Sequence, residues 1–419
     1  MLECRLQQER VIVFTKLEAD RLRFYRFGGR IGASLEGEAV VKEETRIVNH
    51  WWHSAYDRWL DKQDAPITTG YYVDDLREVP RGYWSLRGCP AAILKLNGHE
   101  GVTEARVLEI PAGQTIPPFR MALEEVIYVA EGNGIATVWA DGMPKTIFEW
   151  QKHSFFRIPN NHYYELSNTR GDRPAITLHS SYLPMAMATN PNPDYYFNND
   201  YVDTTELYDA DGQFYSSEAR AVKQEKNRGG ETSTSVTWYA NFFPDLTLWD
   251  HLDAYGADKG RLAYSGGIQF PNSAIRTGLM VLPSKRYRNA HRHGPGVTIV
   301  GIQEADGYVI MWPEGASRED HVICPWKEGA VFVPPNHWYH MHVNAGASEN
   351  RQLRMFPPQP LMNYTAADPD RYIPFTKEEP WIRQMFDEET AKRGLKSKMP
   401  PECYTDPDYR WDVSWLKED

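Results

Sequence analysis

Little in this sequence points to disulfides, to a membrane or to nucleic acid. Cysteine occurs only four times in 419 residues, at Cys4, Cys89, Cys324 and Cys403, with no CxxC pair. This spacing argues against a disulfide framework and against a cysteine-based zinc site. No apolar run approaches the ~20 residues of a membrane-spanning helix. Lys plus Arg number 46 against 57 Asp plus Glu, a net charge of −11 with no basic block, which argues against nucleic acid as a partner.

The opening segment MLECRLQQERVIVF also lacks the basic, then apolar, then small-residue order of a signal peptide. We therefore expect a cytoplasmic chain. Aromatic side chains, in contrast, are plentiful at 13% of the residues, and there are 30 Gly and 29 Pro. This combination of aromatics and turn formers favours a mainly all-β protein, and the length favours two domains.

Short β-branched and aromatic runs alternate with Gly, Pro and Asn turns in two stretches of the chain. The first stretch, about 90–185, contains ARVLEI, EEVIYVAE and AITLHSS, and the second, about 260–357, contains RTGLMVL, GYVIMW and RQLRMF. Each pattern predicts a meander of short antiparallel strands, and the repetition predicts a duplicated β-barrel. The expected domains are an N-terminal extension with a helix (1–64), an N-terminal barrel (65–185), a linker or long loop (186–245), a C-terminal barrel (246–360) and a tail with a helix (361–419).

One helix is predicted before the two β units. Asn49 is its expected N-cap. The residues that share one face at helical spacing are Trp52, Tyr56, Trp59 and Leu60. His50 and His53 lie three residues apart on this helix, but no third ligand is near them, so we expect surface residues.

A second helix is predicted in the C-terminal tail, over EEPWIRQMFDEETAKRG. Pro380 falls in its first turn and Gly394 ends it. Trp381, Met385 and Ile382 supply the apolar stripe. We expect this helix to pack on a barrel or on a partner subunit.

Four histidines form the constellation most suited to chemistry. His291 and His293 in RNAHRHGPGV are two residues apart, and so are His340 and His342 in NHWYHMHVNAG. On a strand, residues two apart point to the same face, and a barrel turns one face of each strand into its lumen. His291, His293 and His340 can then converge on one divalent ion, for which three imidazoles suit Fe(II), Mn, Ni, Cu or Zn. His342 beside them is a candidate proton donor or acceptor, or else a packing residue.

Three further residues are weaker candidates for binding a substrate. Arg276 on the run RTGLMVL can pair with a carboxylate if it points inward. Trp338 can floor a pocket for an aromatic ring, and Gln303 is near an expected lumen strand.

These segments resemble the paired motifs of the cupin superfamily, G-x5-H-x-H-x3,4-E-x6-G and G-x5-P-x-G-x2-H-x3-N. The resemblance implies His291, His293 and His340 as metal ligands, with Asn344 as the terminal Asn of the second motif. The family's Glu position falls on Val297 or Thr298, so no carboxylate ligand is implied. The glycine that opens the first motif falls on Lys285, and the inner glycine of the second falls on His337.

The first β unit fits the same motifs in spacing but not in chemistry. Gly113, Glu125 and Gly132 keep their places, whereas Phe119 and Met121 stand at the two histidine positions. In the second motif Tyr164 replaces the ligand histidine, while Asn168 remains. Phe, Met and a phenol make a poor divalent-metal site, so this barrel is expected to be metal-free. Its lumen should be packed with side chains, although Glu125 beside Tyr164 could instead bind a ligand.

The strings HRHGPG, PPNHWYHMHVNAG and EEPWIRQMFDEETAKRG together resemble a two-cupin family similar to gentisate dioxygenases, over about residues 65–395. The resemblance implies a bicupin fold and a metal-dependent dioxygenase, with Fe(II) favoured. Its substrates would be O2 and an aromatic or small organic acid. Two alternatives stay open: a non-redox lyase, isomerase or decarboxylase with Zn, Mn or Ni, and a binding protein without turnover. We also expect a homo-oligomer, because β-rich chains often pair their exposed strand edges.

Overall fold

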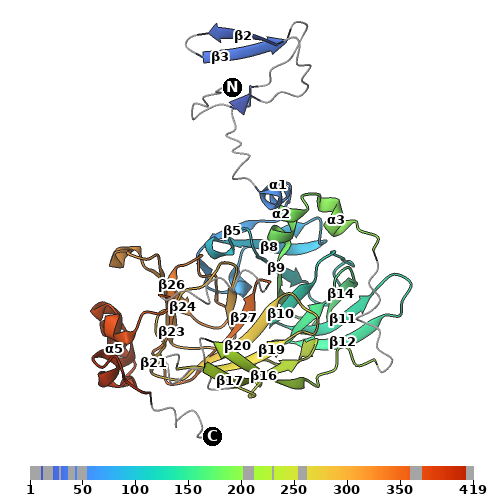
Figure 1. Ribbon diagram of the computed structural model, residues 1–419. Helices are drawn as coiled ribbons and strands as arrows, with labels where there is room; N and C mark the ends of the chain where they lie inside the picture. The colour runs from blue at the N-terminus through green and yellow to red at the C-terminus, as the bar shows by residue number, and fades with distance from the viewer. Residues whose placement is uncertain are drawn as a thin grey trace.

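The computed structural model describes residues 54–201, 212–228, 231–252, 262–358 and 370–411, with backbone alone for 224–228 and 231–234. It also gives the backbone of four short N-terminal strands, β1 (Val11–Ile12), β2 (Leu22–Phe27), β3 (Arg30–Leu35) and β4 (Glu43–Glu44). The predicted N-cap Asn49 and the histidines His50 and His53 lie outside the described residues. The described chain is mainly β, and its two halves lie side by side (Figure 1).

A large and a small sheet make up the N-terminal half. The large sheet has the order β18-β13-β10-β15-β9-β8-β5, with β7 also paired to β8, and the small sheet has the order β12-β11-β14. The strands are β5 (Ile67–Gly70), β7 (Gly82–Trp84), β8 (Cys89–Leu96), β9 (Glu104–Ile110), β10 (Glu125–Glu131), β11 (Asn133–Trp139), β12 (Thr146–Gln151), β13 (Phe155–Ile158), β14 (Tyr163–Asn168), β15 (Ala175–Ser181) and β18 (Phe242–Phe243).

The C-terminal half repeats this arrangement. Its large sheet has the order β16-β17-β19-β20-β27-β22-β25-β6, and its small sheet has the order β21-β26-β23-β24. The strands are β6 (Tyr72–Val73), β16 (Arg220–Arg228), β17 (Glu231–Tyr239), β19 (Tyr264–Gln269), β20 (Arg276–Leu282), β21 (Arg286–Tyr287), β22 (Thr298–Gly301), β23 (Gly307–Trp312), β24 (Val322–Trp326), β25 (Val331–Phe332), β26 (Tyr339–Asn344) and β27 (Asn350–Phe356). The order β13-β10-β15-β9-β8 thus matches β25-β22-β27-β20-β19, which confirms the predicted pair of antiparallel β-barrels.

The turns repeat as well as the strands. Gly113 has φ +65°, and Lys285, at the corresponding place in the C-terminal half, has φ +58°. Asn161 (φ 57°) and His337 (φ 59°) form a second such pair. Left-handed backbone favours glycine. Lys285 and His337 therefore keep the turn geometry even though each stands where the cupin pattern has glycine.

Each large sheet is completed by a strand from outside its own half. Val73 in β6 pairs with Val331 in β25, and Phe242 in β18 pairs with Phe156 in β13. The halves also touch at a short 3-10 turn, Asn97–His99, where His99 Nε2 lies 3.2 Å from Thr298 Oγ1. These links hold the two barrels in one orientation.

Four buried apolar clusters fill the molecule. One occupies the N-terminal lumen, and one lies between the two large sheets. A third fills the C-terminal lumen, with Met280, Trp326 and Phe332 among its members. The fourth covers the outer face of the small C-terminal sheet. The C-terminal barrel is therefore supported on both sides of its small sheet.

Four α-helices have described side chains: α1 (Ala55–Leu60), α2 (Leu183–Thr189), α3 (Pro193–Phe197) and α5 (Pro380–Lys392). The first has Ser54 as its N-cap, which forms a capping box with Asp57, because the Ser54 hydroxyl and the Asp57 carboxylate each accept a backbone N–H. Among the described residues, no helix is long and apolar enough to cross a membrane.

The C-terminal helix α5 has the predicted bounds, and Gly394 follows it at φ +69°. Its buried face is Ile382, Phe386 and Thr390, while Trp381 and Met385 pack at the edge of that face. The helix covers the outer face of the small C-terminal sheet (Figure 1). Short 3-10 turns lie at Leu76–Glu78, Arg318–Asp320, Phe375–Lys377 and Pro401–Tyr404.

The segment 186–245, expected as a linker or long loop, carries α3, β16, β17 and β18. Strand β17 pairs with β19 in parallel and so extends the large C-terminal sheet. The β-branched run TSTSVTW in β17 has strand propensity that the polar composition of the segment conceals.

Substitution of Gly98 tests the contact between the halves. A Cβ at Gly98 would overlap the carbonyl oxygens of Val333 and Pro334, which belong to the other barrel. Because backbone cannot move aside cheaply, Gly98→Ala should lower the free energy of unfolding by about 2 kcal/mol or more. Gly171→Ala is the matched control, since no atom lies within 4 Å of that Cβ. Its effect in urea denaturation should stay within about 0.5 kcal/mol. Equal stabilities for the two variants would contradict the packing described.

Candidate metal centre

Strand β26 carries two of the histidines on its inner face. His340 pairs with Met311 and His342 with Val309 across the small sheet, so both side chains point the same way. The alternate residues of the strand, Tyr339, Met341 and Val343, are buried in the cluster under α5. The strand is thus fixed from outside while its histidines project into the lumen.

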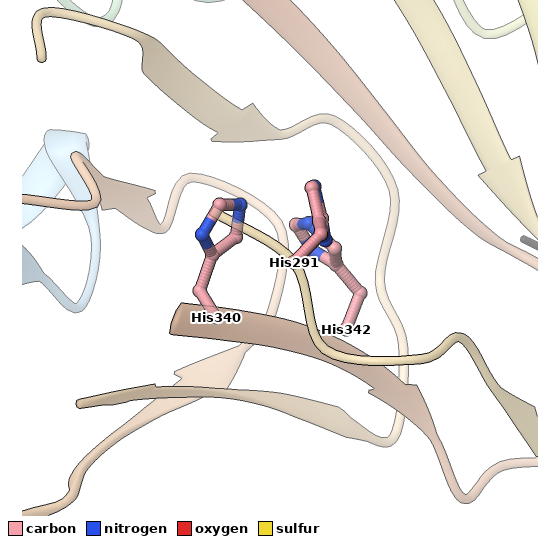
Figure 2. Close-up of side chains that lie close together, drawn as sticks. All are labelled: His291, His340 and His342. Carbon is pink, nitrogen blue, oxygen red and sulfur yellow. The ribbon is translucent and has the colours of Figure 1, made fainter. Parts of the chain in front are cut away.

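The third histidine comes from an irregular segment that passes over β26. His291 forms an isolated antiparallel bridge with His340, with N–H to O=C distances of 2.9 and 2.8 Å in the two directions. The other side of the segment is held by Tyr372, whose ring is stacked 6.0 Å from that of His291. Figure 2 shows the rings of His291, His340 and His342 turned toward one space.

Four of the nitrogen atoms in these three rings have no hydrogen-bond partner among the described residues. One ring nitrogen from each of His291, His340 and His342 lies within 4.8 Å of the others. This is close to the ~3–4 Å that separates nitrogens bound to one ion. Nδ1 of His291 and His342, and both ring nitrogens of His340, are buried without a hydrogen-bond partner among the described residues. Buried polar atoms normally have partners, so this cluster fits a divalent metal.

The three histidines that converge differ from the predicted set in one member. His293 lies beside the cluster, with its ring 4.7 Å from that of His340, but its Nδ1 is 2.8 Å from the carbonyl oxygen of Gly294. His342, expected as a proton carrier, takes its place in the group. The cause is local: residues 288–293 form no regular strand, so the alternation that aligns His340 with His342 does not hold there.

All four imidazoles are held neutral. Burial is the largest cause that lowers the pKa of His291, His340 and His342 well below its ordinary value, and nearby Arg288 adds to it. Burial likewise lowers the pKa of His293 to about 4. The charged side chains that act most strongly on these pKa values are arginines, namely Arg288, Arg354 and Arg371. Neutral imidazole is the form that binds metal.

Arginines and aromatic rings surround the cluster. Arg354 Nη2 donates to the Leu279 carbonyl oxygen at 3.0 Å, its Nε is buried without a partner among the described residues, and burial lowers its pKa to about 10. Arg288 contacts the sulfur of Met280 at 3.1 Å. The rings of Trp326 and Phe332 lie 5.6 and 5.9 Å from that of His342. The lumen therefore combines apolar and aromatic side chains with the positive charges of Arg288 and Arg354.

The weaker sequence candidates make the following contacts, and Trp338 packs against the apolar cluster of the C-terminal lumen. Arg276 lies over the ring of Phe356, at 5.8 Å, beside Arg354. Trp338 packs against Tyr71, with ring centroids 5.2 Å apart, and Gln303 is half-buried in the bend after β22. Sequence reasoning missed Arg354. The signal was present, because Gln352 and Arg354 are polar at strand spacing in a run whose alternate residues are apolar.

The N-terminal barrel has the corresponding geometry without the ligands. Phe119 and Tyr164 form the isolated bridge that His291 and His340 form in the other half. Met121 is buried nearby, and Tyr164 donates a hydrogen bond to Glu125 at 2.7 Å. No group of three potential metal ligands is found in this barrel among the described residues.

Asn168 and Asn344 have the same structural role in the two barrels. Asn344 Nδ2 donates to the carbonyl oxygens of Leu282 and Ser348, and its Oδ1 accepts the Gly346 N–H. Asn168 Nδ2 donates to three carbonyl oxygens and its Oδ1 accepts the Arg170 N–H. Each amide closes the loop that follows its strand, which explains why it remains in both barrels.

Comparison with known proteins gives structural neighbours alone. No family model matches the chain, and no curated protein matches it in sequence. Among solved structures, a mutant of Bacillus subtilis oxalate decarboxylase has a TM-score of 0.41 at 11% identity, covering 80% of this chain and 88% of that one. The formate complex of Lactobacillus farciminis oxalate decarboxylase has a TM-score of 0.43 at 11% identity, covering 80% and 96%.

The fold is the two-domain β-barrel fold of bicupins. The repeated strand order, the paired bridges at the two lumens and the shared asparagines carry this assignment. One barrel contains a buried three-histidine cluster fitted for a divalent ion, and the other contains apolar and phenolic side chains in its place.

Substitution of single histidines separates the two possible ligand sets. His291→Ala and His340→Ala should each remove most of the bound metal, because both residues belong to either set. His342→Ala should do the same, whereas His293→Ala should retain at least half of the metal. Elemental analysis of the purified variants measures this. His321→Ala is the control, because His321 lies in the same barrel but its Nδ1 is hydrogen-bonded to the Ser317 carbonyl oxygen. Metal loss with His293→Ala but not with His342→Ala would favour the predicted set.

The lowered pKa values predict how metal retention depends on pH. Protons compete with a metal only below the pKa of the ligand, and burial places these pKa values below that of an exposed histidine, ~6.5. Metal content after dialysis should therefore stay constant from about pH 7.5 down to about pH 5.5. A half-loss of metal near pH 6.5 would show instead that the ligands titrate as exposed histidines do.

Proposed function

We propose that this protein is a metal-dependent enzyme, an Fe(II) dioxygenase that acts on an aromatic or small organic acid in the C-terminal barrel. The observation that carries the proposal is the buried cluster of His291, His340 and His342, whose ring nitrogens include four without a hydrogen-bond partner among the described residues. A likeness of the sequence motifs to gentisate dioxygenase-like cupins supports the same reaction class.

The three histidines are the residues that would hold the ion. When bound there, a divalent metal supplies Lewis acidity and open coordination positions. Neutral imidazoles add no negative charge, and the charged side chains that act most strongly on these histidines are the arginines Arg288 and Arg354. The site therefore keeps its positive charge and favours an anionic substrate.

Arg354 is the side chain best suited to recognise the acid group. Its pKa of about 10 keeps it cationic at neutral pH, and its Nε has no hydrogen-bond partner among the described residues. A guanidinium is matched in shape to a carboxylate. Arg288 supports it by placing a second positive charge near His291 and His342.

The aromatic lining favours a ring-bearing acid and a dry site. Trp326 and Phe332 flank His342, and Met280 and Met311 belong to the same cluster. Exclusion of water strengthens the attraction between the cations of the lumen and the substrate. Burial holds the pKa of His293 at about 4, so this imidazole is neutral, and its Nδ1 lies 2.8 Å from the Gly294 carbonyl oxygen.

Oxygen uptake tests the proposal. Protein purified without air and loaded with Fe(II) should consume O2 when given 2,5-dihydroxybenzoate or another small aromatic acid. His340→Ala should lower this rate by at least 100-fold, and His321→Ala should leave it unchanged. Release of CO2 from oxalate without O2 uptake would move the protein to the decarboxylases. No metal in the wild-type protein would contradict an enzyme of either kind.

Substitution of Arg354 tests the recognition of the acid group. Arg354→Gln should raise KM for the acid by about 10- to 100-fold, because a charge-assisted hydrogen bond contributes roughly 1.5–3 kcal/mol. The metal content should not change. Arg276→Gln is the matched comparison, since Arg276 is the other arginine stacked on Phe356. A larger effect from Arg276 would transfer the role to that residue.

A further inference from the structure

Arg87 is a buried cation in the N-terminal lumen. It lies in the turn after β7, where its backbone N–H donates to the Trp84 carbonyl oxygen at 3.0 Å, and its exposed fraction is 2%. Its guanidinium carbon lies 3.8 Å from the ring centroid of Phe119 and 5.0 Å from that of Tyr164. Phe119 and Tyr164 are the pair that corresponds to His291 and His340. A fixed organic cation thus lies where the other barrel has its metal ligands.

The carboxylates near Arg87 are already engaged. Glu125 accepts from Tyr164 at 2.7 Å and pairs with Arg106 at 3.5 Å. Glu104 accepts from Tyr56 at 2.6 Å and also pairs with Arg106. Glu104 and Glu125 therefore both pair with Arg106.

The guanidinium of Arg87 therefore has no carboxylate partner among the described residues. Neither Nη1 nor Nη2 has a hydrogen-bond partner among the described residues. Two further titratable neighbours carry no charge. Burial and the positive charges of Arg87 and Arg106 lower the pKa of His179, and burial raises the pKa of the Cys89 thiol to about 11. A charge this deeply buried is costly unless an anion or hydrogen bonds compensate it.

We propose that the N-terminal barrel binds a small carboxylate at Arg87, through the two terminal nitrogens of the guanidinium. Planar carboxylates match this fork in geometry and charge. The surrounding side chains of Phe119, Met121 and Tyr164 are at most 6% exposed, so the place is enclosed, and acetate is the smallest organic carboxylate with an apolar end to test there. The proposal does not depend on the proposed function, because neither the metal nor the C-terminal barrel takes part.

Thermal unfolding with acetate tests this site. The protein carries His291→Ala and His340→Ala and is treated with a chelator, so that acetate cannot act through a metal. Its Tm should rise with the logarithm of the acetate concentration, since acetate binds the folded state alone. Arg87→Met, which replaces the cation by an apolar chain of similar length, should abolish the rise. Arg87→Lys, which keeps the charge without the fork, should reduce it.

The matched control is Arg120→Met in the same background. Arg120 also lies over a tyrosine ring, 4.5 Å from Tyr163, but it pairs with Asp141 at 3.2 Å. This variant should keep the full response to acetate. Sodium chloride at equal ionic strength should produce no rise. An equal response to chloride, a response that survives Arg87→Met, or no response in any variant would overturn the proposal, and the last result would leave Arg87 as a cation–π contact alone.

Discussion

The burial of neutral imidazoles in the C-terminal lumen is the constraint on which the site depends. His340 is fully buried and both of its ring nitrogens lack partners among the described residues. A site of this kind is stable only when something compensates the polar nitrogens. The surrounding fold is arranged to tolerate it: Tyr339, Met341 and Val343 anchor the outer face of β26 beneath α5, and the bridge between His291 and His340 fixes the second segment. Apolar packing on the outer face of β26 thus stabilises the strand, while its histidines face the lumen.

The two barrels share a backbone arrangement but differ in the side chains that it carries into the lumen. Both place an isolated backbone bridge at the mouth of the lumen, and both close the following loop with an asparagine. In the C-terminal barrel the bridge carries imidazoles, with Arg288 nearby. In the N-terminal barrel it carries Phe119 and Tyr164 with the guanidinium of Arg87 over their rings. A buried guanidinium therefore lies at the place that corresponds to the histidine cluster of the other half.

Much of the fold was predictable because strand periodicity and motif spacing are local. The runs of both β units, the bounds of the C-terminal helix and the same-face pair His340 and His342 all follow from the sequence. The grouping of His342, rather than His293, with His291 and His340 did not follow, because period-two alternation was applied to residues 288–293, which form no regular strand. Arg87 and Arg354 reach their places through turns and sheet pairing that motif spacing does not describe. The strands in 186–245 were concealed by polar composition.

X-ray absorption at the iron edge of the Fe(II)-loaded protein tests the central claim most directly. The account predicts a shell of nitrogen and oxygen at ~2.0–2.2 Å with the outer scattering of three imidazoles, and with no sulfur. His342→Ala should lose one imidazole from that pattern, and His293→Ala should lose none. A shell with fewer than two imidazoles, or one that contains the sulfur of a lumen methionine, would contradict the three-histidine centre.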